Sequence, residues 1–128
     1  MSYLFDASAI LKTIKEGKIE VLAGNYTTEL ARYELGNALW KERMLHKKID
    51  AEELYRLTKT IKDTLKLLNI LNIECYEEKI VALAEKLNLT FYDASYVYLS
   101  KEKKLTLVTE DNNLINKAKN YTKIIKTI

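Results

Sequence analysis

Four of the acidic residues stand in apolar surroundings, where a carboxylate is costly to place unless something compensates its charge. Asp6 ends the run YLFD, Glu34 lies within ARYELGNALW, Asp93 lies within LTFYDASYVYL, and Asp111 closely follows LTLV. Most of the other acids have lysine neighbours, which is typical of a solvated surface. These four residues are therefore the first candidates for chemistry.

If the four carboxylates converge, they need cations or bound protons, because like charges at short range repel one another. Carboxylate oxygens together with water suit Mg²⁺ or Mn²⁺. Zinc fits poorly, since the chain has one cysteine, Cys75, and one histidine, His46, which we expect to be exposed in its lysine-rich stretch. The same composition excludes an internal disulfide and disfavours catalysis by a Ser–His–Asp triad.

Each acid also has an ordinary structural explanation. Asp6 could turn the chain out of a strand, and Glu34 could pair with a basic residue on its own helix. Asp93 comes three residues after Thr90, a spacing close to that of a capping box. Asp111 could lie in the first turn of a helix, where the helix dipole favours negative charge. Taken singly, each acid leaves this alternative open.

Apolar periodicity, capping residues and breakers divide the chain into alternating strands and helices. We expect strands over residues 2–5, 25–28, 71–76 and 105–108, with an edge strand in 121–126. Ser8 is the expected cap of a helix that runs to Lys15, and a short helical turn follows to Leu22. Further helices are expected over 29–48, from Asp50 onward, and over 77–87, 90–103 and 111–119.

Strands that alternate with helices indicate crossover connections and a mostly parallel sheet covered on both faces. The sequence therefore predicts an α/β fold, a three-layer α/β/α sandwich with about four or five short strands, in a single domain over residues 1–128. The carboxyl ends of parallel strands share one edge, and ligands bind there. Asp6 and Asp111 each follow an expected strand, and Asp93 and Glu34 are expected to face the same crevice.

The composition is that of a globular protein, since hydrophobic residues make up 48% of the chain,. A net charge of +3 permits contact with nucleic acid without arguing for it,. No basic-then-apolar leader opens the sequence, and no apolar run approaches the ~20 residues that span a membrane. We therefore expect a cytoplasmic protein without a membrane partner.

The ordered set of acidic segments resembles PIN-domain ribonucleases, and most closely the VapC-like toxins of toxin–antitoxin pairs. The resemblance rests on YLFDASAI, ARYELGNALWK, TFYDASYVYLS and LTLVTEDNNL, and it covers nearly the whole chain. It implies a PIN-like fold and metal-dependent hydrolysis of RNA phosphodiester bonds. The metal-binding and catalytic acids of the family fall on Asp6, Glu34, Asp93 and Asp111.

The resemblance also implies supporting roles. The small hydroxyl residues near the family's site fall on Ser8 and Thr109, which would orient water or phosphate. Asn37, one turn after the helical acid, would orient that acid or approach the RNA backbone, with plain helix packing as the alternative. Some relatives carry a further acid where this chain has Asn112 and Asn113, so one or two Mg²⁺ or Mn²⁺ ions are both compatible with the sequence.

Three basic residues near the acids in sequence are candidates for electrostatic contact with the RNA backbone. These residues are Lys12, Lys15 and Arg32.

The resemblance implies three partners: an RNA substrate, a second copy of the chain in a homodimer, and a cognate antitoxin that blocks the acidic crevice. An apolar stripe on the helix after Asp50, with Tyr55 and Trp40 nearby, indicates either core packing or a groove for a partner. The stripe consists of Leu54, Leu57, Ile61, Leu65 and Leu68.

The sequence has two alternative functional interpretations. A haloacid-dehalogenase-like phosphatase needs a second Asp two residues after Asp6, where this chain has Ser8. A PIN-like module that binds RNA or protein without cutting is the stronger alternative. The acids at all four positions argue against it, because a bare acidic cluster hinders RNA binding.

Overall fold

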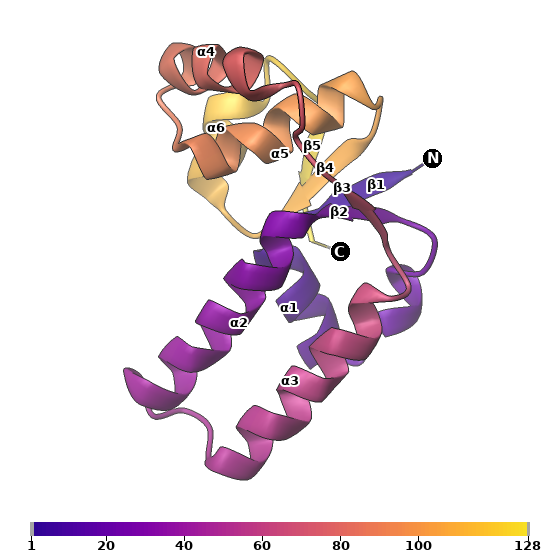
Figure 1. The fold of residues 1–128 in the computed structure, drawn as a ribbon, viewed down its shortest axis with the longest axis vertical. Helices are drawn as coiled ribbons and strands as arrows, with labels where there is room; N and C mark the ends of the chain where they lie inside the picture. The colour runs from indigo at the N-terminus through magenta and orange to yellow at the C-terminus, as the bar shows by residue number, and fades with distance from the viewer. Residues whose placement is uncertain (1, 128) are drawn as a thin grey trace.

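The computed structural model describes residues 2–127 and shows a parallel sheet between two layers of helices (Figure 1). Every strand pairing in the sheet is parallel, and the strand order is β3-β2-β1-β4-β5. The strands are β1 (Tyr3–Phe5), β2 (Tyr26–Thr28), β3 (Asn69–Leu71), β4 (Thr106–Thr109) and β5 (Ile124–Lys126). The predicted three-layer α/β/α architecture is confirmed.

The helices fall into two groups, one on each face of the sheet (Figure 1). The first group contains α1 (Ala7–Lys15), α2 (Glu29–Met44) and α3 (Ala51–Leu65), with a short 3-10 turn at Ile19–Val21. The second contains α4 (Glu77–Leu87), α5 (Phe91–Glu102) and α6 (Asn112–Ala118). Helices α2 and α3 lie side by side and reach away from the sheet.

The central strands are buried on both faces because their side chains alternate between the two helical layers. Leu4 of β1 and Leu107 of β4 belong to the core under α4–α6. Phe5 and Val108, the next residue in each strand, belong to the core under α1–α3. The apolar runs YLF and TLV are therefore short strands that supply both cores at once.

The expected start of the first helix was wrong by two positions. Asp6, not Ser8, is the N-cap, and its carboxylate accepts a hydrogen bond from the Ala9 N–H. Ser8 lies inside the first turn of α1. An Asp with extended backbone caps a helix as well as a Ser does, so the residue that directly follows β1 is also the N-cap of α1.

The expected strand over 71–76 was also wrong, since β3 covers Asn69–Leu71. The Asn69 N–H donates to the Asn25 carbonyl, and its side-chain amide donates to the Gly24 carbonyl, which fixes the strand earlier in the chain. Beyond Leu71 the Asn72 side chain accepts from the Glu74 N–H. This local turn competes with extended pairing.

Helix α2 ends at Met44, although we expected it to reach residue 48. Lys47 has a φ of 51°, which a right-handed helix cannot accommodate,. Asp50 then caps α3 in a full capping box with Glu53, as expected from its position,.

Most of the apolar stripe of α3 is core. Leu57, Ile61, Leu65 and Leu68 are buried under the first helical layer, and Leu54 packs against them while partly exposed. Core packing therefore explains the stripe. The exposed apolar residues nearby are others, including Tyr55 of α3 and Trp40 of α2.

Leu65→Ala is expected to lower the free energy of unfolding by about 2–5 kcal/mol, because it opens a cavity in this core. Tyr55→Ala removes a side chain that is 76% exposed on the same helix, and we expect a change below about 0.5 kcal/mol. Urea unfolding followed by circular dichroism measures both. Similar losses in the two variants would contradict the assignment of the stripe to the core.

Candidate active site

The candidate site lies where the strand order reverses. From β1 the chain adds β2 and β3 on one side of the sheet, and then returns to place β4 and β5 on the other. In open α/β sheets, ligands bind at the carboxyl ends of the strands beside such a reversal. Asp6 directly follows β1, and Thr109 is the last residue of the neighbouring strand β4.

Asp6 is buried, with 7% of its surface exposed, and three donors hold its carboxylate. Oδ1 accepts from the Ala9 N–H at 2.9 Å and from the Ser8 hydroxyl at 2.7 Å. Oδ2 accepts from the Thr109 hydroxyl. Asp6 thus caps α1 and joins the carboxyl ends of two adjacent strands, so its position is fixed before any ligand arrives.

The hydroxyls of Ser8 and Thr109 also organise the loop after β4. Ser8 Oγ accepts from the Glu110 N–H at 3.1 Å, and Thr109 Oγ1 accepts from the Asp111 N–H at 3.1 Å. The structure therefore places both predicted hydroxyl residues in contact with Asp6. The hydrogen bonds of Ser8 and Thr109 orient the Asp6 carboxylate and the loop that follows β4.

Asp111 is the N-cap of α6, one position before the first turn in which we expected it. One carboxylate oxygen, Oδ1, accepts from the Asn113 N–H at 2.9 Å and the Leu114 N–H at 3.2 Å. The capping explanation for this residue is correct. It does not exclude a second role, because the other carboxylate oxygen, Oδ2, remains available to a ligand.

Glu34 comes from α2 and is half-buried. Its Oε1 accepts a hydrogen bond of 2.8 Å from the hydroxyl of Tyr96, a residue of α5 that is almost completely buried. This bond connects the two helical layers across the sheet edge. The alternative explanation, in which Glu34 pairs with a basic residue on its own helix, is not among the contacts described for residues 2–127.

Asp93 lies in the first turn of α5, where the Thr90 hydroxyl caps the helix by accepting from the Asp93 N–H at 3.1 Å. The helix-start explanation is therefore correct for its backbone. Its carboxyl group is half-buried and lies close enough to Asp111 and Asp6 for their charges to raise its pKa.

The four carboxyl groups form one electrostatic cluster. Burial raises the pKa of Asp6, and the charge of Asp111 adds to the effect. Burial also raises the pKa of Glu34, with contributions from Asp6 and Asp93. For Asp93, burial is again the largest cause, followed by Asp111 and Asp6. The sequence-predicted acids are thus brought together, at a cost to their ionised forms.

A hydrated divalent cation fits this donor set. Among residues 2–127, no three acidic, histidine or cysteine side chains enclose a metal ion as they stand. Mg²⁺, however, usually keeps several waters and takes only one or two carboxylates directly. Clustered carboxylates with raised pKa values suit such an ion, because its charge compensates their repulsion.

The three basic candidates all have acidic neighbours. Lys12 Nζ lies 3.2 Å from Glu110 Oε1, Lys15 pairs with Glu42, and Arg32 Nε lies 3.1 Å from Glu29 Oε1. The two lysines border an open groove of about 600 Å³ between α1 and α2, next to the acids. The groove is lined by Ala7, Ser8, Leu11, Lys12, Lys15, Glu16, Glu34, Ala38 and Glu110.

The asparagine candidates occupy different settings. Asn37 is exposed on α2, and its side chain has no hydrogen bond in the part of the chain that is described. Asn112 Oδ1 accepts from Lys126 Nζ at 3.0 Å, so this residue helps to tie α6 to β5. His46 is exposed, as expected.

Sequence reasoning missed Tyr96. The available signal was its position three residues after Asp93, which places both residues on one face of α5. A tyrosine inside a buried helix also requires a partner for its hydroxyl group. The long separation from Glu34 concealed which partner that would be.

Comparison of the chain with models of known protein families identifies its family. The family model for the PIN domain matches residues 3–120. The chain belongs to the PIN domain family. Among curated proteins, none gives a significant match to this PIN domain.

Two solved structures are similar to this PIN domain over nearly its whole length. PAE2754 from Pyrobaculum aerophilum is 30% identical, with a TM-score of 0.82, and the match covers 99% of this chain and 91% of that one. A toxin–antitoxin complex from Klebsiella pneumoniae is 18% identical, with a TM-score of 0.72, covering 99% and 98% of the two chains. The second likeness shows the fold alone.

Without metal, the PIN domain is expected to lose stability as the pH rises from about 4 toward neutrality. The ordinary pKa is 3.8 for Asp and 4.5 for Glu, and the values of Asp6, Glu34 and Asp93 are raised above these in the folded state. Above the ordinary values the folded state therefore holds more protons than the unfolded chain, and stability falls with pH.

Asp93→Asn is expected to raise the melting temperature of the metal-free protein at pH 7 and to flatten this pH dependence. Differential scanning calorimetry from pH 4 to 8 in EDTA measures both. Asp63→Asn changes the same charge on the exposed face of α3 and is the control. A lower melting temperature for Asp93→Asn across the range would contradict repulsion within the cluster.

Tyr96→Phe is expected to lower the free energy of unfolding by about 1–3 kcal/mol, because it removes the partner of a half-buried carboxylate. It should also raise the pKa of Glu34 further, since the Tyr96 hydrogen bond lowers that pKa. Carboxyl NMR titration measures the second effect. Tyr98→Phe is the matched control on α5, where Tyr98 packs against Tyr76; an unchanged Glu34 pKa in Tyr96→Phe would refute the contact.

Proposed function

We propose that this PIN domain is a Mg²⁺- or Mn²⁺-dependent ribonuclease that hydrolyses RNA phosphodiester bonds. The observation that carries the proposal is the meeting of Asp6, Glu34, Asp93 and Asp111 in one electrostatic cluster at the strand-order reversal. Such a cluster destabilises the free protein, and a polyanionic substrate would be repelled by it. Both difficulties disappear when a divalent cation is bound.

The residues that would hold the cation are Asp6, Asp93 and Asp111, directly or through water. When bound, a divalent cation polarises the scissile phosphate and activates water for attack. Asp6 is the fixed ligand, since its three donors hold the carboxylate while leaving lone pairs free,. Ser8 and Thr109 maintain that orientation.

Glu34 is positioned to accept a proton from a water molecule. Tyr96 occupies Oε1, which leaves Oε2 for a water molecule. A carboxyl group with a raised pKa accepts a proton more readily than an ordinary glutamate, which is the requirement for a general base,. Glu34 would therefore orient the attacking water and receive its proton.

The groove between α1 and α2 offers a path for the RNA backbone. Lys12 and Lys15 border it, and a phosphate would replace Glu110 or Glu42 as their partner. Both lysine side chains are exposed, so each can turn toward a phosphate in the groove.

We further propose that the protein is the toxin of a toxin–antitoxin pair and that it works in the cytoplasm as a homodimer. The Klebsiella pneumoniae neighbour supports the first part, because that structure is a toxin–antitoxin complex. An antitoxin would cover the α1–α2 groove with a basic side chain directed at the acids. In the described part of the chain, no helix is long and apolar enough to cross a membrane.

Purified protein is expected to cut structured RNA with Mn²⁺ or Mg²⁺ and not with EDTA. Asp6→Asn and Asp93→Asn should each lose at least about 100-fold in cleavage rate, since even residues that only support metal ligands account for 10–100-fold. Asp63→Asn is the charge-matched control and should cut normally.

Metal should also raise the melting temperature of the wild-type protein, because it binds the folded state alone. Wild type and both site variants cutting alike would contradict the proposal. A metal-induced thermal shift without cutting by the wild type would instead favour the non-cleaving alternative, a PIN-like module that binds RNA or protein.

A further inference from the structure

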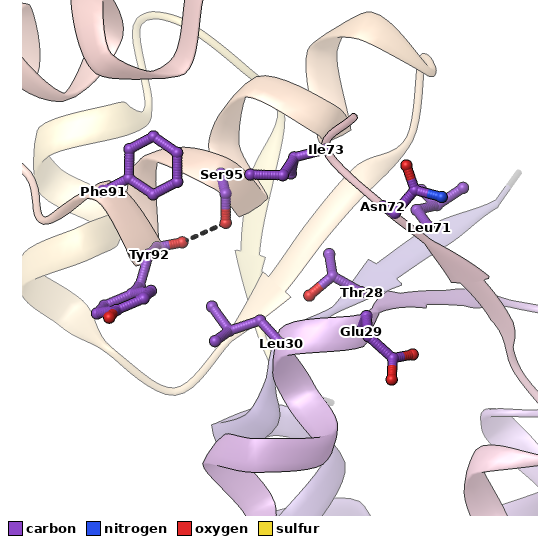
Figure 2. A pocket seen from close by; sticks show the side chains of 9 residues that line it. All are labelled: Thr28, Glu29, Leu30, Leu71, Asn72, Ile73, Phe91, Tyr92 and Ser95. Carbon is purple, nitrogen blue, oxygen red and sulfur yellow. Dashed lines mark hydrogen bonds between the residues drawn. The ribbon is translucent and has the colours of Figure 1, made fainter. Parts of the chain in front are cut away.

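We infer that a second, apolar cavity beside the acids is a subsite for one base of the RNA substrate; this inference rests on the proposed function. The cavity has a volume of about 180 Å³ and is shown in Figure 2. It is lined by Thr28, Glu29, Leu30, Leu71, Asn72, Ile73, Phe91, Tyr92 and Ser95.

The cavity lies at the same edge of the sheet as the acidic cluster. Thr28 and Leu71 are the last residues of β2 and β3. Leu30 lies one helical turn before Glu34 on the same face of α2. On α5, Tyr92 directly precedes an acid of the cluster. A nucleotide chain with its phosphate at the acids would therefore pass this cavity.

The walls suit a flat heteroaromatic ring. Figure 2 shows the Phe91 and Tyr92 rings on one flank, with Thr28 and Leu71 on the other. Leu30 and Ile73 add further apolar surface. Pockets for drug-sized ligands measure ~300–1,000 Å³, so this smaller cavity matches a single ring system. Unpaired RNA bases are commonly bound by stacking on aromatic side chains.

Polar groups stand where the edge of a base would lie. Asn72 Oδ1 is used by the Glu74 N–H, which leaves its amide hydrogens available as donors. The Ser95 hydroxyl donates to the Tyr92 carbonyl at 2.6 Å, so its oxygen can still accept (Figure 2). Thr28 Oγ1 is buried and faces the hydroxyl of Tyr96, the residue that donates to Glu34.

These groups favour a base over an apolar side chain of a partner protein. An apolar side chain would use the walls alone and would leave the Asn72 amide and the Ser95 hydroxyl oxygen without ligand partners. The only acid in the lining, Glu29, is an ion-pair partner of Arg32, so its charge repels a passing phosphate less. Tyr92 is adjacent to Asp93 in the sequence, so the cavity is close to the proposed site of the reacting phosphate.

The test measures the affinity of a short single-stranded RNA by fluorescence anisotropy, with Ca²⁺ in place of Mg²⁺. Tyr92→Ala should weaken binding about 5- to 150-fold, the loss typical of one stacked base. Tyr92 is 59% exposed, so the variant should keep its fold. Tyr55→Ala, which removes an exposed tyrosine from α3, is the matched control. Asn72→Ala is a second variant at the rim of the cavity.

RNAs that carry one abasic position each identify the base concerned. At one position near the cleaved bond, removing the base should weaken wild-type binding but have little further effect on Tyr92→Ala. If no position shows this coupling and Tyr92→Ala binds like wild type, the subsite is refuted, and a partner's apolar side chain becomes its occupant.

The outcomes separate the two proposals. Metal-dependent cutting that Asp93→Asn abolishes, without coupling at Tyr92, would retain the nuclease and refute the subsite. Coupling at Tyr92 in a protein that cuts no RNA would retain the subsite and refute the nuclease.

Discussion

The buried carboxylate of Asp6 is the interaction on which the site depends. Its side-chain hydrogen bonds link the end of β1 to the first turn of α1 and to the end of the neighbouring strand β4. Burying a charged group at this point is unfavourable unless each oxygen is satisfied. The Ser8 and Thr109 hydroxyls provide that satisfaction and also hold the loop that carries Asp111.

The cluster reduces the stability of the metal-free protein, and the proposed cation would offset this cost. Burial and mutual repulsion raise the pKa values of Asp6, Glu34 and Asp93, so the ionised native state is less stable than isolated acids would make it. The two apolar cores, which meet through the alternating residues of β1 and β4, offset this penalty. The rigid sheet therefore maintains an arrangement of charges that flexible loops would relax.

Much of the fold was predictable because its signals are local. Short apolar runs between capped helices indicated a parallel sheet, and the capping box of Asp50 marked the start of α3. The start of α1 was mispredicted because Asp6 and Ser8 are both suitable caps, whereas the position of β3 was mispredicted because it depends on contacts with distant residues. The Asn69 bonds to Gly24 and Asn25 are an example, since no local pattern records them.

The four acids could be identified in the sequence from their apolar neighbours. The contacts that orient these acids could not be predicted from it. Asp6 and Asp111 are helix caps as well as candidate ligands, so capping is the observed role of these residues, and the proposed ligand role is compatible with it. The bond between Tyr96 and Glu34 joins opposite layers of the fold, and only the tertiary structure shows it.

The central claim is that these carboxylates bind a divalent cation, and anomalous diffraction from crystals soaked in Mn²⁺ tests it most directly. The account predicts an anomalous peak within coordination distance of Asp6, directly or through one water, and its loss in crystals of Asp93→Asn. A well-diffracting wild-type crystal with Mn²⁺ bound elsewhere, or with no peak near Asp6, would contradict the account.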